Sequence, residues 1–192
     1  MKVHIGRIGI LAAAAGLAVL LAPPLGATDI FRARMLTGKA PVEPPVVNVR
    51  IEIESYTTPQ DVLGLQDAMN SGGEDAFLKM FASMKKGVVR IMDRRGWNLE
   101  VHAAQMVPTE KGRKLQLFML RQSWDPGNQM VRTGADFFMV LELNLNEKNN
   151  GDGRLYEDAG INLAPLAGRI EMRRYGSAPK IIVMAAQVKK AP

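Results

Sequence analysis

Histidine, the residue type best suited to acid–base or metal chemistry near neutral pH, occurs only twice in this chain, as His4 and His102. His4 lies in a segment interpreted below as a leader. On strand parity, His102 lies on the face opposite Leu99 and Val101, and we expect it to be exposed. No Gly-x-Ser-x-Gly sequence is present to supply a nucleophile, and the chain has no cysteine. A zinc site would therefore depend on one histidine and carboxylates, so neither role is favoured.

Carboxylates are the other residues with catalytic chemistry. Four of them fall in predicted strands or loops: Asp125, Glu142, Glu157 and Asp158. A hydrolase or isomerase that uses such carboxylates is one alternative for the function. Their positions in the sequence do not pair any two of them, however, and acidic side chains on strand exteriors are ordinarily solvated.

The segment Asn146–Glu157 has the length of a calcium-binding loop, with Gly151 at the sixth position and Glu157 at the twelfth. Lys148 occupies the third position, where a calcium loop needs an oxygen ligand. A Gly/Asn-rich hairpin turn is therefore the favoured interpretation, and we expect no metal and no cofactor.

Basic residues gather after a predicted helix, next to Trp97: Lys85, Lys86, Arg90, Arg94 and Arg95. They are candidates for contact with an anionic surface such as a lipid head group, a polysaccharide or a nucleic acid. The favoured interpretation is a solvated helix end and turn, because Asp93 dilutes the cluster and blocks this short are usually wet surface. Nucleic acid is not an expected partner.

Two aromatic features are candidate ligand or partner contacts. Trp124 and Asp125 lie on the longest predicted internal loop, 123–136, where the tryptophan either serves function or holds the loop to the sheet. Phe118 and Phe138, with Leu120 and Val140, form a second apolar face that would line the cavity of a closed barrel. Methionines at positions 69, 80, 84 and 139 fall on predicted core faces, where methionine fills gaps.

The N-terminus has the order of a secretory signal peptide. Lys2 and Arg7 precede the apolar run Ile8–Ala22, which is shorter than the roughly 20 residues that a membrane-spanning helix needs. We expect residues 1–27 to be cleaved after Ala27. The net charge of the whole chain is +6, and loss of the two basic residues of the leader would leave +4, which favours anionic partners only weakly.

The remaining chain divides into a tether and one domain. Residues 28–45 are expected to be a Pro-rich flexible tether, since Ala40–Pro45 contains three prolines. Residues 46–192 are enough for a single domain with a sizeable core. Alternation of apolar and polar residues predicts a strand over Val47–Glu54.

A helical hairpin is predicted after this strand. Thr58 can cap its first limb, with Asp61 completing a capping box. Gly72 and Gly73 interrupt the apolar periodicity, and Phe77, Met80, Phe81 and Met84 resume it at helical spacing.

The rest of the sequence alternates strands with short turns, the strands being predicted at 88–92, 97–103, 114–122, 137–145, 154–163, 169–174 and 181–188. Short connections imply antiparallel neighbours. The fold class is therefore α+β: a predominantly antiparallel meander of about eight strands, either open or closed into a barrel, with a helical hairpin after the first strand.

The segments Ile51–Phe77 and Leu141–Leu155 resemble a group of uncharacterised exported bacterial proteins. The shared features are an alternating strand, an aromatic-Thr-Thr turn, a helix broken by Gly-Gly, and a Gly-x-Gly pair. The resemblance implies a shared fold and export, with Gly151 and Gly153 as turn residues. It implies no activity and no residue role.

These observations predict an exported, periplasmic or extracellular module that is not an enzyme and that binds a protein of the cell envelope or a ligand. One alternative is a carrier that holds an apolar small molecule in a closed barrel; the other is the carboxylate-dependent enzyme.

Overall fold

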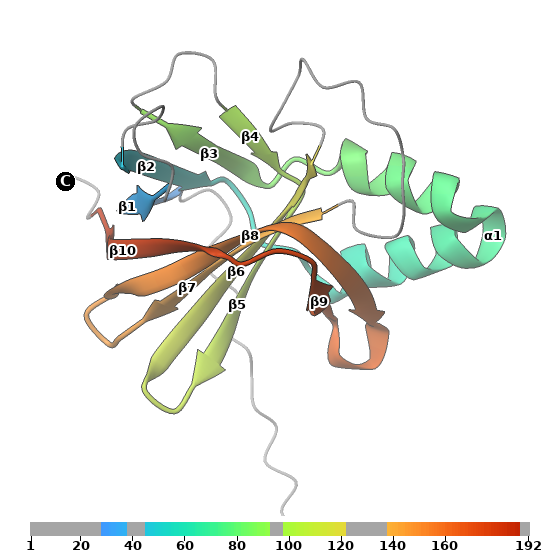
Figure 1. Ribbon diagram of the computed structural model, residues 1–192. Coiled ribbons are helices and arrows are strands. Elements are labelled where there is room, and N and C mark those ends of the chain that lie inside the picture. The colour runs from blue at the N-terminus through green and yellow to red at the C-terminus, as the bar shows by residue number, and fades with distance from the viewer. Residues whose placement is uncertain (1–27, 38–44, 93–97, 122–137, 189–192) are drawn as a thin grey trace, which may run out of the picture.

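The computed structural model describes residues 28–37, 45–92, 98–121 and 138–188. Its elements follow in chain order (Figure 1): β1 Asp29–Leu36, β2 Val46–Ile53, α1 Pro59–Ser83, β3 Gly87–Ile91, β4 Asn98–Val101, β5 Ala103–Thr109, β6 Gly112–Leu120, β7 Phe138–Leu145, β8 Asn150–Ala164, the 3-10 turn η2 Pro165–Ala167, β9 Arg169–Tyr175 and β10 Lys180–Gln187. No helix among the described residues is long and apolar enough to cross a membrane. The predicted signal peptide, residues 1–27, lies outside the described ranges.

The strands form one ten-stranded antiparallel sheet in the order β4-β3-β2-β1-β10-β8-β7-β6-β5, with β9 paired to β8. Two meanders, β1 to β4 and β5 to β8, are joined by the last strand, which lies between β1 and β8. The prediction of an antiparallel α+β fold is therefore confirmed. The sheet is open rather than closed into a barrel, and it has ten strands where about eight were expected.

One of the additional strands comes from the expected tether. Residues Asp29–Leu36 form β1, which pairs with β2 on one edge and β10 on the other. Phe31, Ala33 and Met35 are buried, while Arg32 and Arg34 are exposed. The sequence alternates apolar and charged residues here, but the three prolines that follow favoured a tether, so the strand was not predicted. The proline-rich residues 38–44 lie outside the described ranges.

The other additional strand arises at His102, where the predicted strand 97–103 is divided. Residues before His102 pair with β3, and residues after it pair with β6. The predicted turn between β9 and β10 also differs from the structure. β9 and β10 do not pair with each other; both run antiparallel to β8. The link from Tyr175 to Lys180 is one residue longer than the stretch of β8 between their partners, Ala159 and Leu155, so it is a bulge rather than a hairpin turn.

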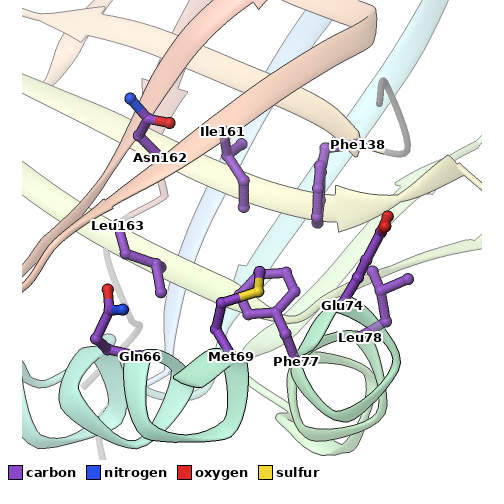
Figure 2. A pocket seen from close by; sticks show the side chains of 9 residues that line it. All are labelled: Gln66, Met69, Glu74, Phe77, Leu78, Phe138, Ile161, Asn162 and Leu163. Atoms are coloured by element: carbon purple, nitrogen blue, oxygen red, sulfur yellow. The ribbon is translucent and has the colours of Figure 1, made fainter. Parts of the chain in front are cut away.

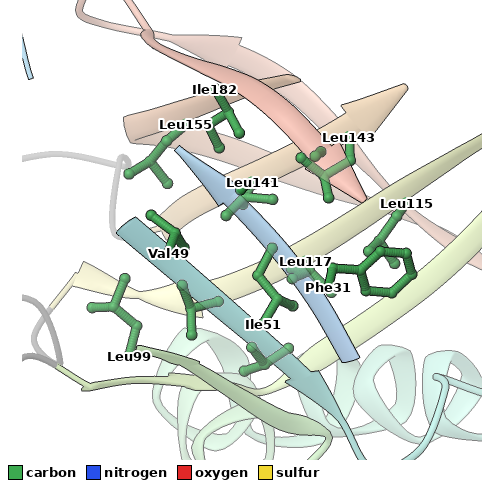
Figure 3. Packing of buried hydrophobic residues seen from close by; sticks show 14 of the residues in the cluster. Phe31, Val49, Ile51, Leu99, Leu115, Leu117, Leu141, Leu143, Leu155 and Ile182 are labelled. Atoms are coloured by element: carbon green, nitrogen blue, oxygen red, sulfur yellow. The ribbon is translucent and has the colours of Figure 1, made fainter. Parts of the chain in front are cut away.

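The sheet curves so that the concave faces of its two meanders pack against each other. Figure 3 shows the side chains of β1 and β2 meeting those of β6, β7 and β8 across this core. Ile51, Leu117 and Leu141 are among the fully buried members. The closed barrel of the predicted carrier is wrong, because the sheet is open. The side chains expected to line its cavity lie on the opposite face of the sheet, in the cluster beneath α1: Phe118, Leu120, Phe138 and Val140.

Helix α1 covers part of the opposite face of the sheet. Thr58 Oγ1 accepts a hydrogen bond from the Asp61 amide, and the Asp61 carboxylate accepts one from the Thr58 amide, which confirms the capping box. Gly73 has φ 68° and ψ −157°, a conformation that favours glycine, and there the helix bends into two limbs that lie side by side (Figure 1). The predicted helical hairpin is confirmed, although it follows the second strand rather than the first.

The Gly/Asn-rich segment after β7 forms a hairpin turn. The side-chain oxygen of Asn146 accepts hydrogen bonds from the amides of Lys148 and Asn150, and Asn149 has φ 60°. Gly151 and Gly153 lie within β8 rather than in this turn. Both approach the backbone of β7 so closely that glycine is required there.

Candidate functional site

A pocket of about 470 Å³ opens between the two limbs of α1 and the second half of β8. Six apolar and three polar residues line it: Met69, Phe77, Leu78, Phe138, Ile161 and Leu163, with Gln66, Glu74 and Asn162. Figure 2 shows Met69 and Phe77 directed from the helix toward the strand residues, with polar groups around them. The volume lies within the range of ≈ 300–1,000 Å³ that is typical of small-molecule sites.

Aromatic packing holds the floor of this pocket. The Phe138 ring lies edge-on to Phe81, with ring centroids 5.3 Å apart, and to Phe77, at 6.2 Å. Phe77 and Phe81 stack at 5.9 Å. Since the three rings come from the helix and from the start of β7, they set the distance between the helix and the sheet.

Hydrogen bonds of Gln105 hold the side of the pocket that is formed by the β8–β9 hairpin. The side-chain amide of Gln105 donates to the carbonyl of Ile170 and accepts from the amide of the same residue, so that β9 is tied to β5. Gln105 also donates to Gln116, which donates to Glu142. These three residues lie in register on β5, β6 and β7. The row keeps the β8–β9 hairpin folded over the sheet, and one side of the pocket depends on that hairpin.

The three polar residues of the lining lie among apolar ones, and together they offer both hydrogen-bond donors and acceptors. Gln66 and Asn162 each carry an amide that both donates and accepts hydrogen bonds, while Glu74 accepts them when ionised. An apolar interior with a few polar groups suits a molecule that has an apolar body and a polar end. The carboxylate of Glu74 disfavours an anionic end and favours a neutral or cationic one.

Of the six predicted contact residues, Phe138 lines this pocket. Phe118 is fully buried in the same aromatic and aliphatic cluster, beneath the pocket rather than in its lining. Trp124, Asp125, Arg94 and Arg95 lie outside the described residues. The sequence analysis missed the helical side of the pocket, where we assigned Met69 to the core. It is 37 % exposed.

The carboxylates considered as catalysts are engaged separately. Glu142 accepts from Gln116 at 2.6 Å, Glu157 pairs with Lys180 at 2.6 Å, and Asp158 pairs with Arg121 at 3.2 Å. The described residues therefore do not form a paired-carboxylate site. Within the same ranges, no group of three or more His, Asp or Glu side chains is placed to hold a metal ion.

The basic cluster is also divided. Lys86 lies 2.8 Å from Asp61 and joins the end of α1 to its beginning. Burial raises the pKa of Asp61, but hydrogen bonds from Lys86 and Thr58 outweigh it, so the pKa is lowered overall. Arg90 lies on the convex face of the sheet, where it pairs with Glu52 at 3.2 Å. The end of the helix therefore does not gather these charges into one site.

His102 is buried, at 3 % exposure, and the expectation that it is exposed is wrong. Its parity was assigned correctly, but α1 covers that face of the sheet. The imidazole lies 5.5 Å from the Phe81 ring, and its Nδ1 is 3.0 Å from the carbonyl oxygen of Met84. A carbonyl only accepts hydrogen bonds, so Nδ1 carries the proton in the neutral form. His102 thus joins the end of α1 to the sheet.

This burial makes stability depend on pH. Burial lowers the pKa of His102 below its ordinary 6.5 and outweighs the bond to Met84 and the charge of Glu100, which raise it. The unfolded chain therefore takes up this proton at a higher pH than the folded one. The contribution to stability is complete above about pH 6.5 and falls as the pH drops through the lowered pKa, with a slope of at most about 1.4 kcal/mol per pH unit.

Urea unfolding between pH 8 and 4.5 checks this prediction. Wild type should lose more stability than His102→Asn, because asparagine keeps a donor for Met84 without titrating. The carboxylates titrate in both proteins and cancel in the difference. Parallel pH profiles for the two proteins would contradict the buried, neutral histidine.

A second polar cluster closes one end of the concave core. Tyr56 donates to Asp29 at 2.7 Å, Gln187 donates to Asp29 at 2.8 Å, and Arg113 donates to Gln187 at 3.0 Å. Burial and the bond to Asp29 raise the pKa of Tyr56, so its hydroxyl stays protonated. Arg113 Nε is buried without a partner in the described part of the chain. Asp29 already accepts two hydrogen bonds, and we interpret the cluster as a cap on the core.

The class defined by this geometry is an open antiparallel sheet with a helical hairpin and an amphipathic pocket between them. Comparison of the chain with protein-family models, with curated proteins and with solved structures found no match. The resemblance to exported bacterial proteins stays a prediction, and functional inference depends on the pocket and the surfaces of this chain.

Proposed function

We propose that this protein is a non-enzymatic, exported module that binds an amphipathic small molecule in the pocket between α1 and β8. The observation that carries the proposal is the lining itself, in which six apolar side chains surround a space of about 470 Å³ and three polar ones can donate or accept hydrogen bonds. Burial of each methylene of a ligand there would contribute about 0.8 kcal/mol. The N-terminal pattern of basic, apolar and small residues supports export.

The expected ligand has an aliphatic or aromatic body and a neutral or cationic end, because the carboxylate of Glu74 is part of the pocket lining. A neutral fluorescent probe such as N-phenylnaphthylamine reports binding, and medium-chain alcohols, amines and carboxylates can compete with it. We expect alcohols and amines to displace the probe at lower concentration than carboxylates of the same length. Native mass spectrometry of protein taken from the cells that make it would then give the mass of the bound molecule.

Met69→Glu should weaken probe binding at least about tenfold, equivalent to ~1.4 kcal/mol. The substitution places a charge against the apolar lining, where a bound ligand would have to desolvate it. Met69 is already 37 % exposed, so the fold should tolerate the change.

Leu63→Glu is the matched control. Leu63 lies on the same limb of α1, is 43 % exposed, and does not line the pocket. It should bind the probe like wild type. Equal binding by all three proteins, or equal loss in both variants, would contradict the assignment of the site.

A further inference from the structure

A row of arginines crosses the convex face of the sheet, away from the pocket. Arg90 on β3, Arg50 on β2 and Arg32 on β1 are direct cross-strand partners. Their side chains point away from the concave core, since the residues that flank each of them are buried there. Arg34 follows on the same face of β1. Four guanidinium groups therefore share one surface of three neighbouring strands.

This arrangement opposes the stability of the sheet, because like charges directly opposite each other on adjacent strands repel. Glu52 offsets part of the repulsion: it lies 2.6 Å from Arg50 and 3.2 Å from Arg90. Burial raises the pKa of Glu52, but the hydrogen bonds from both arginines lower it overall, so its charge is retained. Arg32 and Arg34 are exposed and make no ion pair within the described ranges. The row thus keeps an unneutralised positive end.

Exposed apolar side chains continue this surface. Val46, Leu36 and Ile181 are direct partners across β2, β1 and β10, with exposures of 42, 38 and 42 %. Beside them, Met184 is 66 % exposed. It has φ 54° at a bulge in β10, between the positions paired with Arg34 and Arg32. A bulge redirects a side chain out of the regular pleat, and here it presents a flexible apolar group next to two arginines.

We infer that this convex face, formed by β3, β2, β1 and β10, binds the surface of a membrane that contains anionic phospholipids. Guanidinium groups form paired hydrogen bonds with phosphate. The apolar side chains of Leu36, Ile181 and Met184 can enter the interfacial layer of the membrane. A hydrophilic polyanion has no such apolar layer, so these side chains favour a membrane as the partner. Two acids border the surface: Asp152 on β8, opposite the bulge, and Glu100 on β4, the strand next to β3. The inference is independent of the pocket, which lies over the other meander of the sheet, between α1 and β8.

Vesicle sedimentation tests the inference. The protein is prepared with and without residues 1–27, so that insertion of the apolar run Ile8–Ala22 is measured separately. We expect binding to phosphatidylglycerol-containing vesicles, little binding to pure phosphatidylcholine, and loss of binding when salt is raised from 50 to 500 mM. Each arginine near a charged surface contributes about fivefold.

The variant Arg32→Glu/Arg34→Glu should therefore bind at least about 25-fold more weakly. Lys111→Glu/Lys148→Glu is the matched control, because it makes the same change in net charge in two exposed hairpin turns. Circular dichroism checks that both variants are folded. Equal loss in both would mean that only net charge matters and would overturn the proposed face.

A third variant, Ile181→Ser/Met184→Ser, separates a membrane from a soluble polyanion. It should weaken binding to vesicles several-fold and leave binding to heparin unchanged. If it changes neither while the arginine variant loses both, the face is a polyanion site and the membrane assignment is wrong. Absence of any binding of wild type to anionic vesicles would overturn it as well.

Discussion

Phe81→Ala is expected to lower the free energy of unfolding by about 3–5 kcal/mol, the usual cost of deleting a buried aromatic ring. Phe81 is fully buried and contacts Phe77, Phe138 and His102. Its removal would leave a cavity where the second limb of α1 meets the sheet. Because a small domain is stable by only about 5–15 kcal/mol, this loss is a large fraction of the total.

Chemical denaturation followed by fluorescence or circular dichroism measures the change. Leu63→Ala, on the exposed side of the same helix, should change stability by no more than about 0.5 kcal/mol. The pocket should also lose affinity for the probe in Phe81→Ala, since Phe77 and Phe138 would no longer be held in place. A loss below about 1 kcal/mol would mean that the helix does not depend on this ring.

Gly151→Ala should be similarly severe, with an expected loss of at least about 3 kcal/mol or failure to fold. A Cβ at this position would lie 1.7 Å from the carbonyl oxygen of Asn144 on β7. That atom belongs to a backbone paired on both sides, so β7 and β8 would have to separate. β8 also pairs with β9 and β10, so the displacement would reach the centre of the sheet.

Asp152→Ala provides the control, because it places the same alanine side chain one residue later, on the exposed side of the strand, without adding a new Cβ. Yield of folded protein and the midpoint of thermal unfolding distinguish the two variants. Similar midpoints for Gly151→Ala and Asp152→Ala would contradict the close approach of β7 and β8.

Local patterns in the sequence predicted most elements but not their order in space. The capping box at Thr58 and the glycine step at Gly73 are short-range signals, and both are confirmed. β2 was likewise visible from its alternation. The pairing of β1 with β10 was not, because nothing local links residues at opposite ends of a chain. The weight given to prolines near residue 40 concealed the alternation of Phe31, Ala33 and Met35.

The same limit explains the result for the pocket. Phe138 was expected to line the cavity of a closed barrel, because its strand has a second apolar face. That face is covered mainly by helix α1, and the pocket lies at the edge of their contact. Nothing in the sequence distinguishes Met69 and Gln66, which line the pocket, from residues in the core-facing stripe of an amphipathic helix. His102 was misassigned for the same reason, since parity gives the face of a strand but not what covers it.

The pairing of β1 with β10 has a consequence for how the protein is made. β1 is the first described strand to be synthesised, yet one of its two neighbours is β10, which follows all the other described strands. Until then, the free edges of β1 and β8 present unpaired backbone groups that can join other chains. A growing or incompletely delivered chain is therefore exposed to aggregation and to proteases for most of its synthesis. Loss of β10 would open the middle of the sheet rather than its margin.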